Sequence, residues 1–356
     1  MSPKVTTTVI GSYPRPPFVQ IPDWFNVGLT TSYTTKVTDD YLKNMPADHE
    51  YQVLRAVQDI LQDQDELGID VITDGEVRRG NYVHYHCRHL KGISFDKLTK
   101  KVSRNGAYKF MAPTVVAKIE PTLPFLANEW KINSLFTDKP AKVTLPGPMT
   151  IADTVANEHY EDEQQLYDDI VKALNFEIID LAKNGCVHIQ IDEPILVRKP
   201  EDALAFGIKN LERCFAGVPK HVVKTIHACC GYPDKLDSTD YPKADKDAYL
   251  QVADALDKAS IDAVSLEDTH RRNNLELFSK FKNTTVILGV LGIAESRVET
   301  AEEIKKHIQD VLKKIPSQRL VVAPDCGLGM LPNEICKKKL KNMVDAVTSI
   351  NKDLNT

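Results

Sequence analysis

The sequence predicts an α/β fold, a single-domain (β/α)8 barrel of the TIM-barrel type. Eight short apolar runs alternate with segments of helical periodicity along the 356 residues. Continuous apolar strands of this kind are typical of a parallel sheet that is buried on both faces. Eight of them fit a closed barrel better than a doubly wound sheet, and α/β barrels commonly reach this length as one domain.

The predicted strands are rich in β-branched residues and are followed by turn or polar residues. In chain order they are TTVIGS, IDVITDGE, AKVTLPGP, CVHIQIDEP, HVVKTIHAC, DAVSLE, TVILGVL and LVVAPDCG. Helical periodicity between them predicts core-facing helices over 49–67, 163–184 and 300–315. We expect the first helix to stop at Gly68, where a left-handed cap costs little, and the third to begin with a capping box at Thr300.

Two stretches interrupt this alternation. Residues 13–48 are rich in Pro, Thr and Tyr, and residues 81–140 are too long for a single crossover connection. Long insertions after the first and second strands of a barrel would lie over its mouth, where lids and substrate loops are commonly found. We therefore expect the excursions 13–48 and 81–140 to cover the barrel mouth.

Composition argues against several classes of protein. The formal net charge of −5 is small for this length, so nucleic acid is not an expected partner. The seven cysteines are odd in number and scattered, and no basic segment leads into an apolar one near the first residue, which argues against a disulfide framework and secretion. No apolar run approaches the ~18 residues of a membrane span. We expect a cytoplasmic protein with no membrane partner.

Four residues that follow predicted strands can hold one soft metal ion, namely His227, Cys229, Glu267 and Cys326. Strand ends converge on one mouth of a barrel, so these side chains are expected to meet. Both side chains of the His-x-Cys segment point to the same side of the strand, because side chains alternate with a period of two. Thiolate and imidazole ligands suit zinc, and a carboxylate can fill or vacate a fourth position.

A zinc site of this composition predicts thiol chemistry. A free thiol is largely protonated at neutral pH and attacks saturated carbon poorly, whereas coordination to zinc removes the proton. A structural zinc clamp or a redox switch would use the same residue types. Structural sites usually draw closely spaced ligands from loops, so ligands from three separate strands favour catalysis.

Other histidines and cysteines receive a different interpretation. A second group of metal-ligand composition comprises His84, His86, Cys87 and His89. We interpret its segment as irregular and better suited to lining a substrate pocket. Cys230 points away from Cys229 in an extended chain and is predicted to pack in the core. His270 follows Glu267 closely, but we interpret it as an ordinary loop histidine outside the site.

Six strings at strand ends resemble those of a known family, namely VIGSYP, TDGE, IQIDEP, IHACC, VSLE and VVAPDCG. Together they look like the catalytic barrel of the cobalamin-independent methionine synthases and their short, single-barrel relatives, over residues 5 to about 348. The resemblance implies methyl transfer to the thiol of homocysteine. It also implies that the zinc ligands are the His and Cys of IHACC, the Glu of VSLE and the Cys of VVAPDCG, which are the four residues named above.

The resemblance further implies a site for the amino-acid acceptor. The family's Ile-Gly-Ser segment binds the carboxylate of homocysteine, and this segment falls on Ile10, Gly11 and Ser12. The carboxylates that bind the ammonium group fall on Glu76 and Asp192. Paired carboxylates can instead act as general acid and base, or can be simple partners for nearby cations, here Arg78, Arg79 or Lys109.

The sequence departs from the family on the side of the methyl donor. Thr154 stands where folate-dependent members have a Trp that stacks on the pterin, and Tyr108 and Met111 replace an Arg and a Lys that contact the folate tail. The proposed acid, a His, falls on Ala294. We therefore expect a donor other than the usual folate polyglutamate, for example a methyl group on a corrinoid carrier or another activated alkyl donor.

Two alternative functions remain open. Short members of the family include an enzyme that opens epoxides with another small thiol, so the reaction class is alkyl transfer to a zinc-bound thiolate. A related barrel decarboxylates porphyrinogens, but it needs arginines for the carboxylates of its substrate and no zinc. The pair of cysteines at the strand ends argues against that second alternative.

Overall fold

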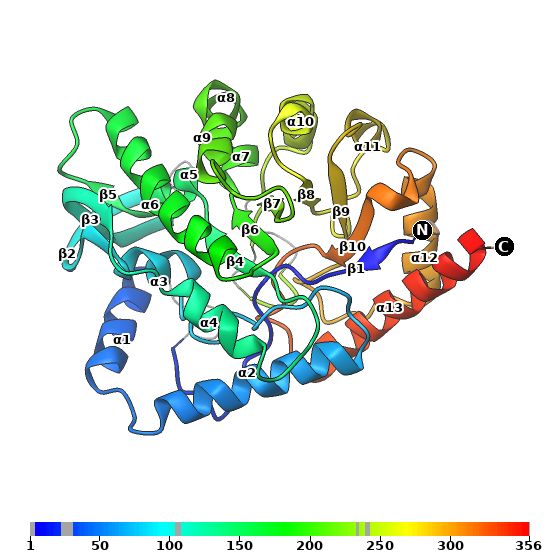
Figure 1. The fold of residues 1–356 in the computed structure, drawn as a ribbon, viewed down its shortest axis with the longest axis horizontal. Helices are drawn as coiled ribbons and strands as arrows, with labels where there is room; N and C mark the ends of the chain where they lie inside the picture. Colours follow the sequence, from blue (N-terminus) through cyan, green and yellow to red (C-terminus); the bar gives the residue numbers. More distant parts are fainter. Residues whose placement is uncertain (1–3, 23–30, 104–107, 233–234, 239–242, 356) are drawn as a thin grey trace.

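The computed structural model describes residues 4–22, 31–103, 108–232, 235–238 and 243–355. Seven parallel strands form one curled sheet in the order β1-β10-β9-β8-β7-β6-β4. These strands are β1 Thr6–Thr7, β4 Val143–Pro146, β6 His188–Asp192, β7 Val223–Ala228, β8 Ala263–Leu266, β9 Thr285–Leu291 and β10 Leu320–Pro324. Figure 1 shows this sheet in the middle of the molecule with helices around its outside. Seven of the eight predicted strands are confirmed.

The predicted strand IDVITDGE is the exception. It makes only isolated bridges, Thr8 to Val71 and Ile72 to Ala141, so among the described residues it is not counted with the seven strands of the sheet. The reason is the side chain of Gln64, which accepts a hydrogen bond from the Thr73 backbone N–H at 3.1 Å and donates one to its carbonyl at 2.8 Å. A side-chain amide thus takes the place of a neighbouring strand where the run would continue.

The three predicted helices are confirmed with small differences at their ends. They are α2 His49–Glu66, α6 Glu163–Lys183 and α12 Ala301–Leu312. Gly68 follows α2 with φ of +84°, the left-handed conformation expected of a helix stop. Thr300 forms a complete capping box with Glu303 at the start of α12. Each helix buries an apolar stripe, so packing against the sheet rather than propensity holds it.

The remaining helices are shorter, apart from α1 and α13, and connect or cover the strands. They are α1 Thr31–Lys43, α3 Tyr82–Arg88, α4 Leu126–Asn133, α5 Pro148–Thr154, α7 Ile195–Arg198, α8 Pro200–Asp202, the π-helix η2 Ala203–Gly207, α9 Ile208–Cys214, α10 Ala248–Lys258, α11 Glu276–Lys280, the 3-10 helix η3 Ser317–Arg319 and α13 Asn333–Asn355. No helix in the described part of the chain is both long and apolar enough to cross a membrane.

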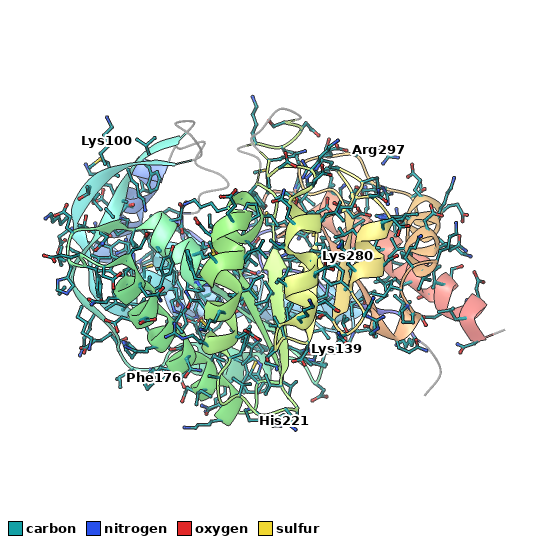
Figure 2. The ribbon with its side chains drawn as sticks, turned by 90° about the horizontal axis from the view of Figure 1, so that it is seen from above. Lys100, Lys139, Phe176, His221, Lys280 and Arg297 are labelled. Carbon is teal, nitrogen blue, oxygen red and sulfur yellow. The ribbon has the colours of Figure 1, made fainter. Side chains whose placement is uncertain are left out.

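The predicted excursions contain structure of their own. Residues 81–140 form α3, α4 and a long antiparallel hairpin of β2 Leu90–Ser103 and β3 Tyr108–Pro121, to which the short β5 Ala156–Asn157 adds. Figure 2 shows Lys100 of this hairpin on the same side of the molecule as Arg297, which follows β9, and opposite His221, which precedes β7. Residues 13–48 contain α1, and their part 23–30 lies outside the described residues.

Candidate metal centre and substrate site

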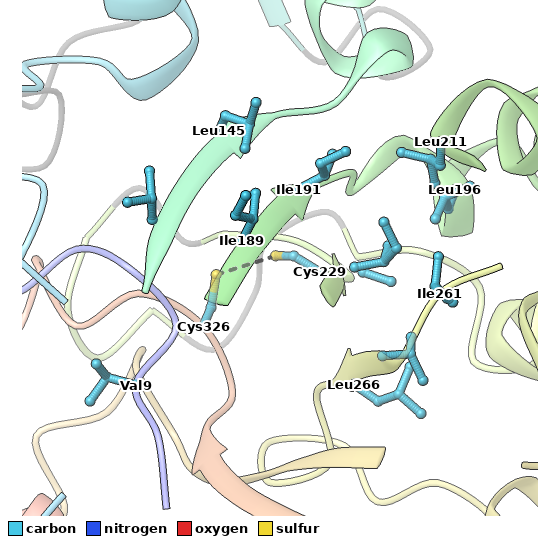
Figure 3. Close-up of a cluster of buried hydrophobic side chains, with 14 of the residues drawn as sticks. Val9, Leu145, Ile189, Ile191, Leu196, Leu211, Cys229, Ile261, Leu266 and Cys326 are labelled. Carbon is cyan, nitrogen blue, oxygen red and sulfur yellow. Dashed lines mark hydrogen bonds between the residues drawn. The ribbon is translucent and has the colours of Figure 1, made fainter. Parts of the chain in front are cut away.

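Three of the four predicted metal ligands meet at the ends of β7 and β10. Nε2 of His227 lies 3.3 Å from Sγ of Cys326, and the two sulfurs of Cys326 and Cys229 are 3.6 Å apart. The ligand atoms of all three residues lie within 4.8 Å of one another, and no other group of three such residues lies this close in the described part of the chain. Figure 3 shows the two thiols facing each other among buried aliphatic side chains. This distance range suits one shared metal ion.

The imidazole of His227 is held in place from its far side. Its Nδ1 lies 3.0 Å from Oγ of Ser265 in β8, which leaves Nε2 directed at the thiols. Only 2% of His227 is exposed, and this burial lowers its pKa to about 3. A neutral imidazole with one nitrogen bound to a fixed neighbour and the other free is the state in which histidine binds metals.

Glu267 lies at the end of β8, beside this cluster but not within the group of three. Both of its carboxylate oxygens are buried and form no hydrogen bond, although Nε2 of His270 lies 3.3 Å from Oε2. Burial and the neighbouring Cys229 raise the pKa of Glu267 well above its ordinary value. A buried carboxylate without hydrogen bonds needs a further partner. A cation held by the adjacent thiols and imidazole would provide that partner.

The two thiols also indicate that a cation belongs in this cluster. The hydrogen bond to Cys326 and then burial raise the pKa of Cys229 well above that of a free thiol. Without a cation both sulfurs are therefore neutral and unreactive, whereas a soft divalent ion would reverse this effect. Two sulfurs, one nitrogen and a displaceable carboxylate form a donor set that zinc accepts. The residues present fit a zinc ion.

The five predicted acceptor residues also lie together, next to these ligands. A Cβ atom placed on Gly11 would overlap Oε1 of Glu76, so the backbone of Gly11 lies directly against this carboxylate. Glu76 has a positive φ of +56°, and its Oε1 accepts a hydrogen bond from Thr144 Oγ1 at 2.5 Å and lies 3.4 Å from Nη1 of Arg79. Arg79 was one of the cations considered as a partner, and the structure confirms that contact.

Asp192 is the last residue of β6 and is 8% exposed. Its Oδ1 accepts a hydrogen bond of 2.7 Å from Nε2 of Gln190, which also donates to the carbonyl oxygen of Ile10 at 2.9 Å. Burial and the charge of Glu76 raise the pKa of Asp192 to about 8. Two carboxylates in one buried place repel each other, and a bound cationic group would relieve that repulsion.

Ser12 connects the two groups of residues. Its Oγ would overlap a Cβ atom on Gly327, the residue after Cys326, and its carbonyl oxygen accepts a hydrogen bond from Leu328 N at 2.8 Å. The charge of Asp192 also contributes to the raised pKa of Cys326. The soft-ligand cluster and the carboxylate pair are therefore parts of one site.

The sequence interpretation missed several contributors to this site. His270 is not an ordinary loop histidine: its side chain is 6% exposed, and its Nδ1 lies 2.8 Å from Oδ2 of Asp325. Burial raises the pKa of Tyr82 well above its ordinary value, and the charges of Asp192, Cys229 and Cys326 contribute to this shift. Spacing from the Glu267 motif could have indicated His270, but no sequence signal pointed to Tyr82.

The second histidine group was predicted to lie in an irregular segment, but His84, His86 and Cys87 lie in helix α3 and His89 directly follows it. Its first two members are buried against aromatic rings, His84 edge-on to Phe95 and His86 against Phe125. Burial lowers the pKa of His84 to about 4 and that of His86 to about 3. These side chains serve packing, since burial among aromatic rings needs neutral imidazoles. Cys230 is also buried in the core, as predicted.

Of the other two candidate cations, only Arg78 has a described side chain, and the residues that replace the family's donor contacts are spread over several parts of the fold. Arg78 pairs with Glu50 rather than with the acceptor carboxylates, and the side chain of Lys109 lies outside the described residues. Thr154 ends α5 with its hydroxyl bonded to the Thr150 carbonyl. Ala294 is buried after β9, whereas the side chain of Tyr108 lies outside the described residues.

Comparison with known proteins agrees with this geometry. Residues 5–349 match the family model described as the cobalamin-independent synthase catalytic domain. A methionine synthase of Saccharolobus solfataricus is 31% identical over 356 residues, covering 99% of this chain and 96% of the relative. A methionine synthase of Sulfurisphaera tokodaii is 30% identical over 354 residues, covering 99% and 94%.

Solved structures show the same similarity. A B12-independent methionine synthase from Shewanella sp. W3-18-1, in complex with selenomethionine, superposes with a TM-score of 0.86 at 28% identity and 99% coverage of both chains. A putative vitamin-B12 independent methionine synthase from Listeria monocytogenes has a TM-score of 0.71 at 18% identity and shares the fold, covering 98% of this chain and 99% of that one. The chain therefore belongs to the family of cobalamin-independent methionine synthases, to which its strand-end motifs are similar.

Proposed function

We propose that this protein is a zinc-dependent methyltransferase that methylates the thiol of homocysteine to form methionine. The observation that carries the proposal is the meeting of a soft-ligand cluster with a buried carboxylate pair at Ser12 and Gly327. The soft-ligand cluster is suited to a thiol and the carboxylate pair to an ammonium group, and an amino-acid thiol such as homocysteine carries both. The names of the relatives and the selenomethionine bound to the Shewanella protein support this assignment.

His227, Cys229 and Cys326 would hold the zinc ion, with Glu267 as a fourth ligand that the substrate can displace. When bound, zinc supplies the positive charge that lowers the pKa of a coordinated thiol, so that the sulfur is a nucleophile at neutral pH. The apolar surroundings of the cluster exclude water from that sulfur. Ser265 keeps the His227 ring in the orientation that a metal needs.

The remaining residues would orient the acceptor. The backbone of Ile10, Gly11 and Ser12 would bind its carboxylate, while Glu76 and Asp192 would bind its ammonium group. With both charged groups fixed, the thiol is directed at the cluster beside Ser12, and this orientation is what makes transfer efficient. An acceptor without an amino group would leave two neighbouring carboxylates unpaired. The carboxylate pair therefore favours homocysteine over other small thiols as the acceptor.

The identity of the donor and the wider setting stay predictions. The substitutions at Thr154, Met111 and Ala294 support a donor other than a folate polyglutamate, for which a corrinoid carrier is one candidate. We also propose that residues 71–72, which bridge to the segments on both sides, close the sheet into a single-domain barrel. The excursions 13–48 and 81–140 would then flank its mouth, and the protein would act in the cytoplasm.

X-ray absorption at the zinc edge tests the proposal. On purified protein without substrate we expect about two sulfur neighbours at ~2.3 Å, and about three when homocysteine is added. Protein without stoichiometric zinc would refute the metal assignment. A zinc site that keeps two sulfurs in saturating homocysteine would refute homocysteine as the acceptor, and 2-mercaptoethanesulfonate would serve as the comparison thiol.

A further inference from the structure

A buried lysine lies beneath the acceptor residues. Lys142 is 4% exposed and directly precedes β4, although lysine is seldom fully buried without a partner. Its Nζ donates one hydrogen bond to the carbonyl oxygen of Val9 and one to Oε1 of Gln190, both 2.6 Å long. Burial lowers the pKa of Lys142 to about 7, while the charges of Asp192 and Glu76 oppose that change. The ammonium group thus ties the chain after β1 to β6 from within the sheet.

The amide of Gln190 can take only one orientation in these surroundings. Gln190 is fully buried, and its Nε2 donates to Ile10 O at 2.9 Å and to Asp192 Oδ1 at 2.7 Å. A lysine ammonium group can only donate, so the carbonyl oxygen of the amide must face Lys142 and the NH2 must face the two acceptors. If the amide were reversed, its NH2 group would face the Lys142 ammonium group, and its oxygen would face the oxygens of Ile10 and Asp192. Lys142, together with the Ile10 carbonyl and Asp192, therefore fixes which way Gln190 points.

We infer that Lys142 is a positioning residue that acts through Gln190 to hold Asp192 where the ammonium group of the acceptor binds. The inference rests on the proposed function, because it assigns the ammonium group of the acceptor to Asp192 and Glu76. It adds that a residue without substrate contact controls discrimination between an amino-acid thiol and the same thiol without its amino group.

Two consequences of the geometry separate this role from general support of the fold. Lys142 donates to the Gln190 amide, and Gln190 in turn donates to Oδ1 of Asp192 at 2.7 Å, so the lysine acts on the carboxylate through one shared side chain. Among the described residues, no hydrogen bond joins Lys142 or Gln190 to the three soft ligands, whose contacts come from β7, β8 and β10. Loss of Lys142 should therefore weaken amino-group recognition and leave the contacts of the thiol end in place, although, after burial, the charge of Lys142 contributes to the lowered pKa of His227.

The test compares two acceptors on zinc-loaded protein by isothermal titration calorimetry. One is homocysteine, and the other is 4-mercaptobutanoate, which has the same thiol and carboxylate but no amino group. Lys142→Met removes the ammonium group and keeps the length of the side chain. We expect it to weaken homocysteine binding at least about tenfold, as for a lost hydrogen bond to a charged group. Binding of 4-mercaptobutanoate should stay within about twofold.

Two further variants sharpen the result. Gln190→Met should reproduce the loss, and the double variant should bind homocysteine no more weakly than Gln190→Met alone, because the two residues act in series. Gln190→Met also carries the test by itself if Lys142→Met does not fold. The matched control is Lys139→Met, since the Nζ of Lys139 contacts Asp65 and the Ile69 carbonyl, neither of which belongs to the site. The control should bind both thiols normally.

Each other outcome has a definite meaning. Equal weakening for both thiols, or a loss of zinc from Lys142→Met, would show a merely structural lysine and overturn the inference. Retained discrimination in Lys142→Met and Gln190→Met would overturn it as well, while the proposed function would stand. Wild-type protein that binds neither thiol would overturn the proposed function itself. Wild-type protein that binds both equally well would refute the ammonium site, and the role of Lys142 with it.

Discussion

A methyl group added at Gly11 would enter the space that the Glu76 carboxylate occupies. A Cβ atom there would overlap Oε1, and it would lie 3.1 Å from Cδ of Glu76 and 3.4 Å from Cγ2 of Thr144. The carboxylate is the end of a flexible side chain, so it would move rather than the strands. In moving it would lose the 2.5 Å hydrogen bond from Thr144 and the 3.4 Å contact with Arg79. We therefore expect Gly11→Ala to displace Glu76 from the acceptor site.

The size of the effect follows from those contacts. A hydrogen bond to a charged group contributes about 1.5–3 kcal/mol, and each 1.4 kcal/mol corresponds to about tenfold in affinity. If the displaced carboxylate also loses the ammonium group of the acceptor, homocysteine should bind about 10- to 150-fold more weakly. Calorimetry on zinc-loaded protein measures this, with thermal unfolding recorded alongside to confirm that the variant is folded.

Two comparisons make this prediction refutable. Gly292→Ala is a matched control, because the nearest atom to its new Cβ would be Oε1 of Glu299 at 3.3 Å, and its affinity should be normal. In a Glu76→Ala background the overlapping atom is absent, so Gly11→Ala should cause little additional loss. Wild-type affinity in Gly11→Ala, or an equally large loss in the Glu76→Ala background, would show that the reasoning is wrong.

Further predictions concern the metal and the buried histidines. In a competition with a chelator, Cys326→Ser should weaken zinc binding by more than about 100-fold, because loss of a ligand costs more than loss of a residue that only supports a ligand. The control is Cys230→Ser, which changes another buried cysteine that is not a predicted ligand and should retain zinc. His270→Gln should weaken zinc binding about 10- to 100-fold because Glu267 loses the neighbour that orients it, and unchanged zinc affinity would refute that role. The pKa of His86 is lowered from 6.5 to about 3 by burial, so its neutral form stabilises the fold above pH 6.5 and this stability is lost as the pH falls from 6.5 towards 3. Urea unfolding of the zinc-free protein at pH 7 and pH 5 should show a loss of about 2 kcal/mol from this residue, which His86→Asn should abolish.

The parts of the fold that the sequence predicted are those that local chemistry determines. The capping box at Thr300 and the glycine after α2 depend on neighbours within a few residues, and both lie where the pattern placed them. The run 69–76 makes only isolated bridges, at residues 71 and 72, and Gln64, on the preceding helix, supplies at Thr73 the hydrogen bonds that a neighbouring strand would have made. A contact between side chain and backbone across a helix–strand connection leaves no periodic signal.

The residues of the site also divide into those that the sequence pattern predicts and those that only the three-dimensional structure shows. His227, Cys229 and Cys326 lie at or just after the ends of β7 and β10, and the parallel arrangement of the strands is enough to bring them together. Lys142 and Gln190 also belong to strand-like runs, but within such runs a polar residue is indistinguishable from one that faces solvent. Only the three-dimensional structure shows that both are buried and bonded to each other. Polar residues inside apolar runs are therefore the sequence feature that deserved a functional interpretation.

Asp325 explains how ligands from separate strands come to the same place. Its buried carboxylate accepts hydrogen bonds from the backbone N–H groups of Asp268, Thr269 and His270, all between 3.0 and 3.2 Å. Burial alone would raise the pKa of Asp325, but the hydrogen bond and charge of His270, with these N–H groups, lower it, so the residue is ionised. Asp325 precedes Cys326, and the turn it binds follows Glu267, so one carboxylate fixes the end of β10 relative to the end of β8. Gly289 in β9 permits this approach, because a Cβ atom there would overlap Oδ1 of Asp325. A glycine inside a strand, an acid before a cysteine and a histidine after a glutamate thus form one unit that positions the metal ligands, although the sequence separates them.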